Sequence, residues 1–163
     1  MLYPVAGSRI FIADLPMDPG GVLPADLGAV PSGAFVEIGE AEAIGTLGGT
    51  WHMVDLEPTL DRPAGWGAAS PPAMSHLKSW LERPVMQIVL GNAPTDPGQA
   101  LLWAAWRSHD AFPFRIAFPG GVILRSWAAL VTELAEVFDT ANSVMKVQAS
   151  LRPVSEILRS EAP

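Results

Sequence analysis

The residues that most often carry chemistry in proteins are few in this sequence and are not arranged for it. The three histidines, His52, His76 and His109, are scattered, and none has the spacing of a metal-ligand pair such as H-x-x-x-H. The absence of Cys excludes thiolate metal sites, Cys nucleophiles and disulfides. The run Ser108-His109-Asp110 holds the letters of a catalytic triad, but a triad is assembled in space, so adjacency says nothing for one. We therefore predict a non-enzymatic protein without a metal or cofactor.

Three acids, Glu37, Glu40 and Glu42, lie close enough in sequence to act together. A pair of carboxylates can serve as general acid and base. No His, Lys or Tyr lies nearby in sequence to shift their pKa values, which favours an acidic face on a solvated strand over a catalytic dyad. On one continuous strand, Glu40 and Glu42 share a face, and Glu37 joins them only if Gly39 forms a bulge.

The composition indicates a single domain, residues 1–163, whose surface is poor in charge. Only 17% of residues are charged and the mean hydropathy is +0.26, whereas an average domain has about 25% charged residues. Such a chain often hides part of its surface against copies of itself, and we favour self-association over a well-packed monomer with a large core.

The net charge of −7 lies entirely in the first half of the chain. Residues 1–75 contain nine acids and two bases, whereas residues 76–163 contain eight of each. Adhesion to nucleic acid is disfavoured, because phosphate contacts need Lys and Arg. A surface that repels DNA while DNA passes remains compatible.

Two further patterns bear on location. The N-terminus lacks the basic segment and apolar core of a signal peptide. The longest dense apolar run, residues 101–106, is too short to cross a bilayer. We expect a soluble protein made in a reducing cytoplasm, with no membrane partner.

Alternation of apolar and polar residues predicts several strands and therefore a mainly β (α+β) fold. A short Pro/Gly turn at 119–121 joins two of them into a hairpin. The predicted strands cover residues 8–14, 35–44, 85–90, 114–118, 122–128 and 144–151.

One helix is clearly indicated. Asp96 can serve as its N-cap, Pro97 suits the first turn, and Gln99 stands where a capping box has its second member. Apolar residues follow at helical spacing until about Ser108. Residues 128–138 could form a helix or extend the preceding strand, and part of 75–83 could be helical.

Residues 15–34 and 55–75 are rich in Pro and Gly without periodicity, so we predict long loops there. Loops of this length in a compact domain are often functional. Trp66 lies in the second loop, where an aromatic residue can dock into a neighbouring molecule or fold back onto its own domain.

The order of these pieces is similar to that in the tail tube proteins (major tail proteins) of long-tailed, siphophage-type phages, a family that includes prophage and gene-transfer-agent versions. The strongest part is D-P-G-Q at 96–99 followed by F-R-I-x-x-P-G-G at 114–121. The resemblance covers nearly the whole chain and also includes 7–13, 35–40 (FVEIGE), 84–90 and 143–151 (SVMKVQASL).

This resemblance implies a β-sandwich or half-barrel flanked by one α-helix, with a long loop and terminal arms. It implies a virion structural subunit that forms hexameric rings, stacked into a hollow tube that conducts DNA during ejection. Implied partners are other copies, a tape-measure protein and tail terminator or distal tail proteins, with DNA crossing the lumen without specific binding. The implied location is the virion tail, after assembly in the bacterial host cytoplasm. We also expect the sheet of one copy to be incomplete until neighbours close it.

By the same resemblance, Glu37, Glu40 and Glu42 are candidate lumen-lining acids, and Leu56, Leu60, Arg62 and Trp66 belong to a candidate inter-ring contact loop. Three alternatives remain open. These are a monomeric β-barrel that binds a small ligand, the tube of a contractile injection or secretion machine, and an enzyme of unknown type, which no catalytic constellation supports.

Overall fold

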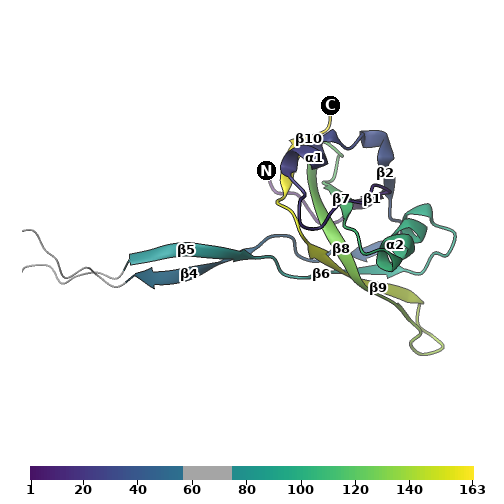
Figure 1. The fold of residues 1–163 in the computed structure, drawn as a ribbon. Coiled ribbons are helices and arrows are strands. Elements are labelled where there is room, and N and C mark those ends of the chain that lie inside the picture. Colours follow the sequence, from purple (N-terminus) through teal and green to yellow (C-terminus); the bar gives the residue numbers. More distant parts are fainter. Residues whose placement is uncertain (57–74) are drawn as a thin grey trace, which may run out of the picture. The chain divides into compact units, whose positions relative to one another are not determined.

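A computed structural model describes residues 1–56 and 75–163, which fall into two units (Figure 1). The first, here called the sheet unit, comprises Met1–Gly48 and Pro84–Pro163. The second, the hairpin unit, is Gly49–Arg83. Its described part is an antiparallel pair formed by β4 (Thr50–Leu56) and β5 (Ser75–Glu82).

The sheet unit is built on one antiparallel sheet in the order β2-β1-β7-β8-β9-β6-β3, with β10 also paired to β8. The 15-residue strand β8 pairs with β7 and β10 along its first half and with β9 along its second, so it belongs to both layers of a sandwich. This confirms the mainly β fold. The strands are β1 (Arg9–Ala13), β2 (Phe35–Glu37), β3 (Ala41–Ala43), β6 (Met86–Gly91), β7 (Phe112–Ala117), β8 (Ile123–Val137), β9 (Lys146–Pro153) and β10 (Leu158–Glu161).

The two end strands of this order, β2 and β3, are neighbours in the chain. β2 pairs with β1, and the Ile38 N–H donates to the Ile10 carbonyl at 2.9 Å. β3 pairs with β6, and the Gly91 N–H donates to the Glu40 carbonyl at 2.8 Å. β2 and β3 do not pair with each other, so both are edge strands and the described sheet of one copy is open. That neighbouring copies close it stays a prediction. Among the described strands, edges are unpaired on the outer sides of β2, β3 and β10 and along β8 beyond Ala129.

The predicted single strand over 35–44 is also wrong. The backbone turns between β2 and β3, where Glu40 adopts a left-handed conformation with φ of 59°. A non-glycine residue rarely takes this conformation. Because it interrupts the extended backbone, the segment passes from one layer to the other here and does not continue as a strand.

The interior between the two layers is filled by side chains. Trp127 and Phe114 are fully buried with ring centroids 6.0 Å apart, and Leu102 of helix α2 (Pro97–Arg107) packs into the same cluster. A smaller cluster, centred on Leu27, Ala111 and Ala128, forms under α1 (Pro24–Ala29).

Helix α2 (Pro97–Arg107) confirms the predicted helix and its cap. The Asp96 carboxylate accepts from the Gln99 N–H at 2.8 Å and also from the Gly39 N–H at 3.2 Å. Gln99 does not complete a capping box. Its Nε2 donates to the carbonyls of Gly91 at 2.8 Å and Gly39 at 3.2 Å, and its Oε1 accepts from the Ala93 N–H at 3.1 Å. We call this set of contacts the DPGQ junction.

Gly98 completes the DPGQ junction by its lack of a side chain. A Cβ at this position would collide with the Glu37 carbonyl oxygen and would lie 2.7 Å from the Ile38 Cα. Only glycine lets the first turn of α2 approach the β2 backbone this closely.

Two ambiguous segments are strands, each with a bulge. In β8, Thr132 is an extra residue between the pairs Val131–Leu151 and Glu133–Ser150, so the inward residues Val131 and Leu134 are three apart. In β5, Ser79 is extra, which puts Leu77 and Trp80 on the same face at the same spacing of three. The suggestion of helix at 75–83 is therefore wrong, because a bulge in a strand imitates helical spacing.

The predicted loop over residues 15–34 is wrong in part. It contains α1 and the short 3-10 helix η1 (Ser32–Ala34). The residue that indicates the start of α1 is Asp26. Its carboxylate accepts from the Leu23 N–H at 2.8 Å and caps the helix. Of the predicted loop over 55–75, the end residues belong to β4 and β5, and 57–74 lie outside the described residues.

We expect Gly98→Ala to lower the free energy of unfolding by about 1–3 kcal/mol, because the added methyl group forces α2 away from β2. Gly33→Ala is the matched control, since nothing lies within 4 Å of its added Cβ, and it should change stability by less than about 1 kcal/mol. Urea denaturation of both variants measures the difference, and equal stabilities would contradict this account of α2.

Candidate functional site

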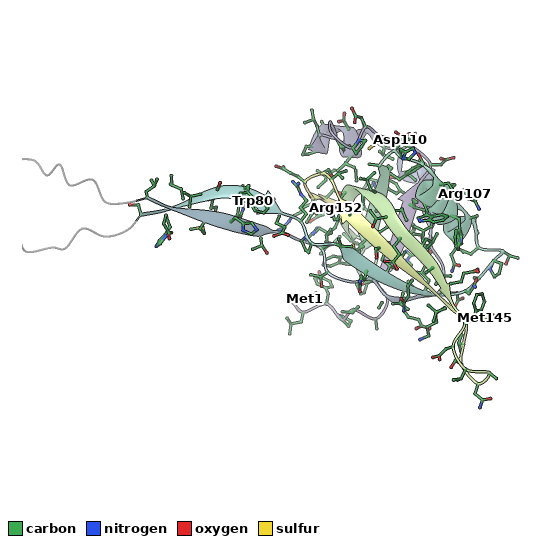
Figure 2. The ribbon with its side chains drawn as sticks, turned by 60° about the horizontal axis from the view of Figure 1, so that its bottom comes forward. Met1, Trp80, Arg107, Asp110, Met145 and Arg152 are labelled. Carbon is green, nitrogen blue, oxygen red and sulfur yellow. The ribbon has the colours of Figure 1, made fainter. Side chains whose placement is uncertain are left out.

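The hairpin unit exposes apolar side chains on one face. The pairing of Val54 with Leu77 and of His52 with Trp80 puts these residues together with Leu56 on this face. The four apolar side chains are between 44% and 54% exposed. Near Trp80, side chains project from both faces of the hairpin (Figure 2). An isolated two-stranded hairpin is at best marginally stable in water, so this surface is suited to contact with another molecule.

The opposite face of the hairpin unit combines apolar and charged groups. Trp51 and Met53 are half-exposed, and the Lys78 ammonium lies 5.5 Å from the centroid of the Trp51 ring. His76 pairs with Asp55 across the strands. This face therefore combines apolar area with one charged pair and a lysine, a mixture that suits the rim of a protein interface.

The hairpin histidines serve local pairing. On the first face, the His52 ring stacks on Trp80 with centroids 3.7 Å apart and pairs with Glu82 at 2.7 Å. Among the described residues, no group of three or more His, Asp or Glu could hold a metal. The Ser108 hydroxyl accepts from the Asp110 N–H at 3.1 Å, so it closes a turn after α2.

A second exposed apolar surface lies at the turn between β8 and β9. Phe138, Val144 and Met145 are all more than half exposed there. Met145, labelled in Figure 2, lies at the base of this turn, where its carbonyl accepts from the Asn92 N–H at 2.9 Å. Neither apolar surface was predicted from the sequence, because residue type does not indicate which apolar side chains the folded chain leaves uncovered.

The structure separates the three predicted lumen acids. Glu37 on β2 pairs with Arg9 at 3.5 Å, and Glu42 on β3 pairs with Lys146 of β9 at 2.7 Å. Glu40 is exposed in the turn between them. They do not share the face of one strand, because the premise of a continuous strand was wrong. Their role in lining a lumen stays a prediction.

Beside Glu42, the outer face of the layer formed by β3, β6, β9 and β8 is polar and mostly uncharged. A shallow hollow of about 110 Å³ lies there, lined by Gln87, Gln148, Ser150 and Glu133 among others. The Ser150 hydroxyl donates to the Glu133 carboxylate at 3.2 Å. The alternation in 144–151 predicted that Gln148 and Ser150 share a polar face. It did not indicate that Gln87 and Glu133 lie beside them on the neighbouring strands.

Of the predicted inter-ring residues, Leu56 lies on the exposed face of the hairpin unit. Leu60, Arg62 and Trp66 lie outside the described residues. Asp96 and Gln99, predicted as a helix cap, form the DPGQ junction. No helix in the described part of the chain is long and apolar enough to span a membrane.

No protein-family model and no curated protein matches the sequence. Three solved structures with a similar fold are distant in sequence. The SPP1 tail tube protein is 11% identical, with a TM-score of 0.57 over 99% of this chain and 80% of its own. A chain of the sixfold-symmetrised anti-feeding prophage baseplate is 15% identical, with a TM-score of 0.60 over 98% and 97%.

A chain of the sheath/tube terminator of the extracellular contractile injection system PVC is 10% identical, with a TM-score of 0.63 over 98% of this chain and 97% of its own. These likenesses extend over nearly the whole sequence. The chain therefore has the fold of phage tail tube proteins.

Proposed function

We propose that this chain is a non-enzymatic structural subunit of a phage-type tail tube, in which copies form six-membered rings that stack into a hollow tube. The observation that carries the proposal is the fold, which is similar to the SPP1 tail tube protein over 99% of the chain. The sixfold symmetry of the anti-feeding prophage baseplate supports a ring of six. The tube belongs to the virion tail and is assembled in the host cytoplasm.

The hairpin unit, in this proposal, is the main contact between rings. Its apolar side chains are exposed in the single copy and become buried against a neighbouring copy. Full burial of a fully exposed apolar side chain of this size is worth about 1.5–3 kcal/mol, and about half of that area remains to be buried here. Leu56 begins this contact, and the adjoining Leu60, Arg62 and Trp66 continue it.

The bore, in this proposal, is lined by the polar face that includes Glu42, together with Glu37 and Glu40. Acids and amides without exposed unpaired bases do not retain phosphate groups, so DNA and a tape-measure protein pass without adhering. Tail terminator and distal tail proteins are the proposed partners at the tube ends.

A second candidate, the tube of a contractile injection machine, is favoured by the likeness to PVC and anti-feeding prophage chains at TM-scores of 0.63 and 0.60. This candidate shares the ring and the bore and differs by needing a sheath around the tube. The alternative of an internal ligand site is disfavoured, because Trp127, Phe114 and Leu102 occupy the space that such a ligand would need.

The purified protein is expected to form rings or tubes as its concentration is raised, because assembly covers the exposed apolar surfaces. Negative-stain electron microscopy over a range of protein and salt concentrations is the measurement. Monomers alone at high concentration under all these conditions would refute the proposed function.

We expect the double variant Val54→Thr/Leu77→Thr to raise the protein concentration needed for assembly at least tenfold. It removes an apolar pair from the exposed hairpin face while keeping residues that favour strands. Ser75→Thr, on the same face, is the control and should assemble like the wild type. Light scattering against concentration measures the effect, and unchanged assembly of the double variant would exclude this face from the interface.

The absence of native Cys permits a clean test of the bore. In assembled tubes, Glu42→Cys should react with a small maleimide but at least tenfold more slowly with a maleimide carried on a large protein, because the bore excludes the larger reagent. The unassembled variant is its own control and should react with both. Glu37→Cys, measured alongside, reports whether that acid also lines the bore. Equal labelling of the Glu42→Cys variant by both reagents in tubes would place this face outside.

A further inference from the structure

The outer face of the layer formed by β2, β1, β7 and the first half of β8 carries a small open hollow that the proposed function does not yet use. Its volume is about 220 Å³. We call it the arginine hollow, because two guanidinium groups line it in a chain that is otherwise acidic. Its principal lining residues are Arg9, Phe11, Ser32, Phe35, Arg115 and Leu124.

Arg115 is held in a fixed position in this hollow. Its guanidinium carbon lies 3.8 Å from the centroid of the Phe35 ring, and its Nε donates to the buried Ser126 hydroxyl at 3.1 Å. A guanidinium that is stacked on an aromatic ring and fixed at Nε loses little further freedom when its remaining N–H groups bind a partner. Partial burial lowers the pKa of Arg115 below its usual value, which reflects the removal of water from a charged group.

The two arginines of the hollow differ in their partners. Arg9 lies 5.5 Å from the Phe11 ring centroid and forms an ion pair with Glu37 at 3.5 Å. Among the described residues, no carboxylate lies within 4.0 Å of the Arg115 guanidinium. Pro163 also lines the hollow, yet Arg115 forms no ion pair among the described residues. This is unfavourable for a partly desolvated charge.

The size and walls of the hollow indicate what can neutralise this charge. Small-molecule sites usually occupy about 300–1,000 Å³, so about 220 Å³ suits a single side chain better than a nucleotide or peptide. Phe11, Ala117 and Leu124 provide apolar walls for methylene groups. A carboxylate matches the planar N–H groups of a guanidinium better than other common side chains do.

We infer that the arginine hollow is the receiving half of a contact between copies, and that it binds a carboxylate side chain of a neighbouring subunit through Arg115. The inference rests on the proposed self-association. A second copy is the favoured source, because the chain carries a net charge of −7 and therefore presents an excess of acids to its neighbours. Such a buried charge pair adds specificity of register to an interface whose affinity comes from apolar burial.

Arg115→Gln should raise the concentration needed for assembly at least tenfold, since it removes the charge that the neighbouring acid needs. Arg115→Lys should fall between Arg115→Gln and the wild type, because lysine keeps the charge but not the planar donor edge. Arg107→Gln is the matched control: it makes the same charge change at the exposed end of α2 and should alter assembly less than twofold. Sedimentation measures assembly, and monomer melting temperature verifies folding.

A second pair of variants leaves Arg115 in place. Ser32→Glu introduces a carboxylate of the same chain at the mouth of the hollow, and Ser32→Gln introduces a group of the same size without charge. The glutamate variant should assemble at least fivefold less readily than the glutamine variant, because its own acid competes with that of the neighbour. This comparison decides the matter even if Arg115→Gln does not fold.

The outcomes separate this inference from the proposed function. If the wild type assembles and folded Arg115→Gln and Ser32→Glu assemble equally well, the carboxylate contact is refuted while the tube proposal stands. If they do so and inorganic phosphate shifts the Arg115 Nε–H resonance of the monomer, the hollow is a small-anion site and the inference is again wrong. Failure of the wild type to assemble would refute both.

Discussion

The fold depends most on satisfying backbone groups where the two layers of the sheet meet, and the DPGQ junction does this with two side chains. The Gly39 N–H, the Gly39 carbonyl and the Gly91 carbonyl lie where the chain crosses between layers, and side chains supply their partners. Asp96 and Gln99 supply the missing partners from the first turn of α2. A buried amide left without a partner costs about 1–3 kcal/mol, so this junction fixes the helix and the crossover between the layers together.

The local half of this arrangement could be predicted from the sequence. The Asp96 cap, Pro97 in the first turn and the apolar spacing that follows are all signals within a few residues, and together they indicate α2. Gln99 was misinterpreted because its true partners, Gly39 and Gly91, are set by tertiary structure. The bulges at Thr132 and Ser79 misled in another way: an extra residue in a strand turns a period of two into a spacing of three, which also indicates a helix.

The candidate surfaces were harder to predict than the fold. Leu56 was identified within a loop, but the strand pairing that brings Leu77 and Trp80 to the same face depends on a bulge that no local pattern reveals. The acids Glu37 and Glu42 were treated as one stripe, yet the left-handed turn at Glu40 sends them to different strands with different basic partners. Residue types indicated which apolar and acidic side chains the chain contains. The crossover between the two layers decides which of these side chains lie together.

One copy offers two kinds of surface for self-association, open strand edges and exposed side chains. The edges of β2, β3 and β10 can associate through backbone hydrogen bonds, which are similar for any strand and discriminate weakly between partners. Side chains can supply the discrimination, from the apolar hairpin, the apolar turn and the charged hollow. In the proposed ring of six, each contact is head-to-tail, and the arginine hollow of one copy meets a different surface of the next. Head-to-tail contacts generate rings when the rotation closes and open filaments when it does not, and a stacked tube uses both.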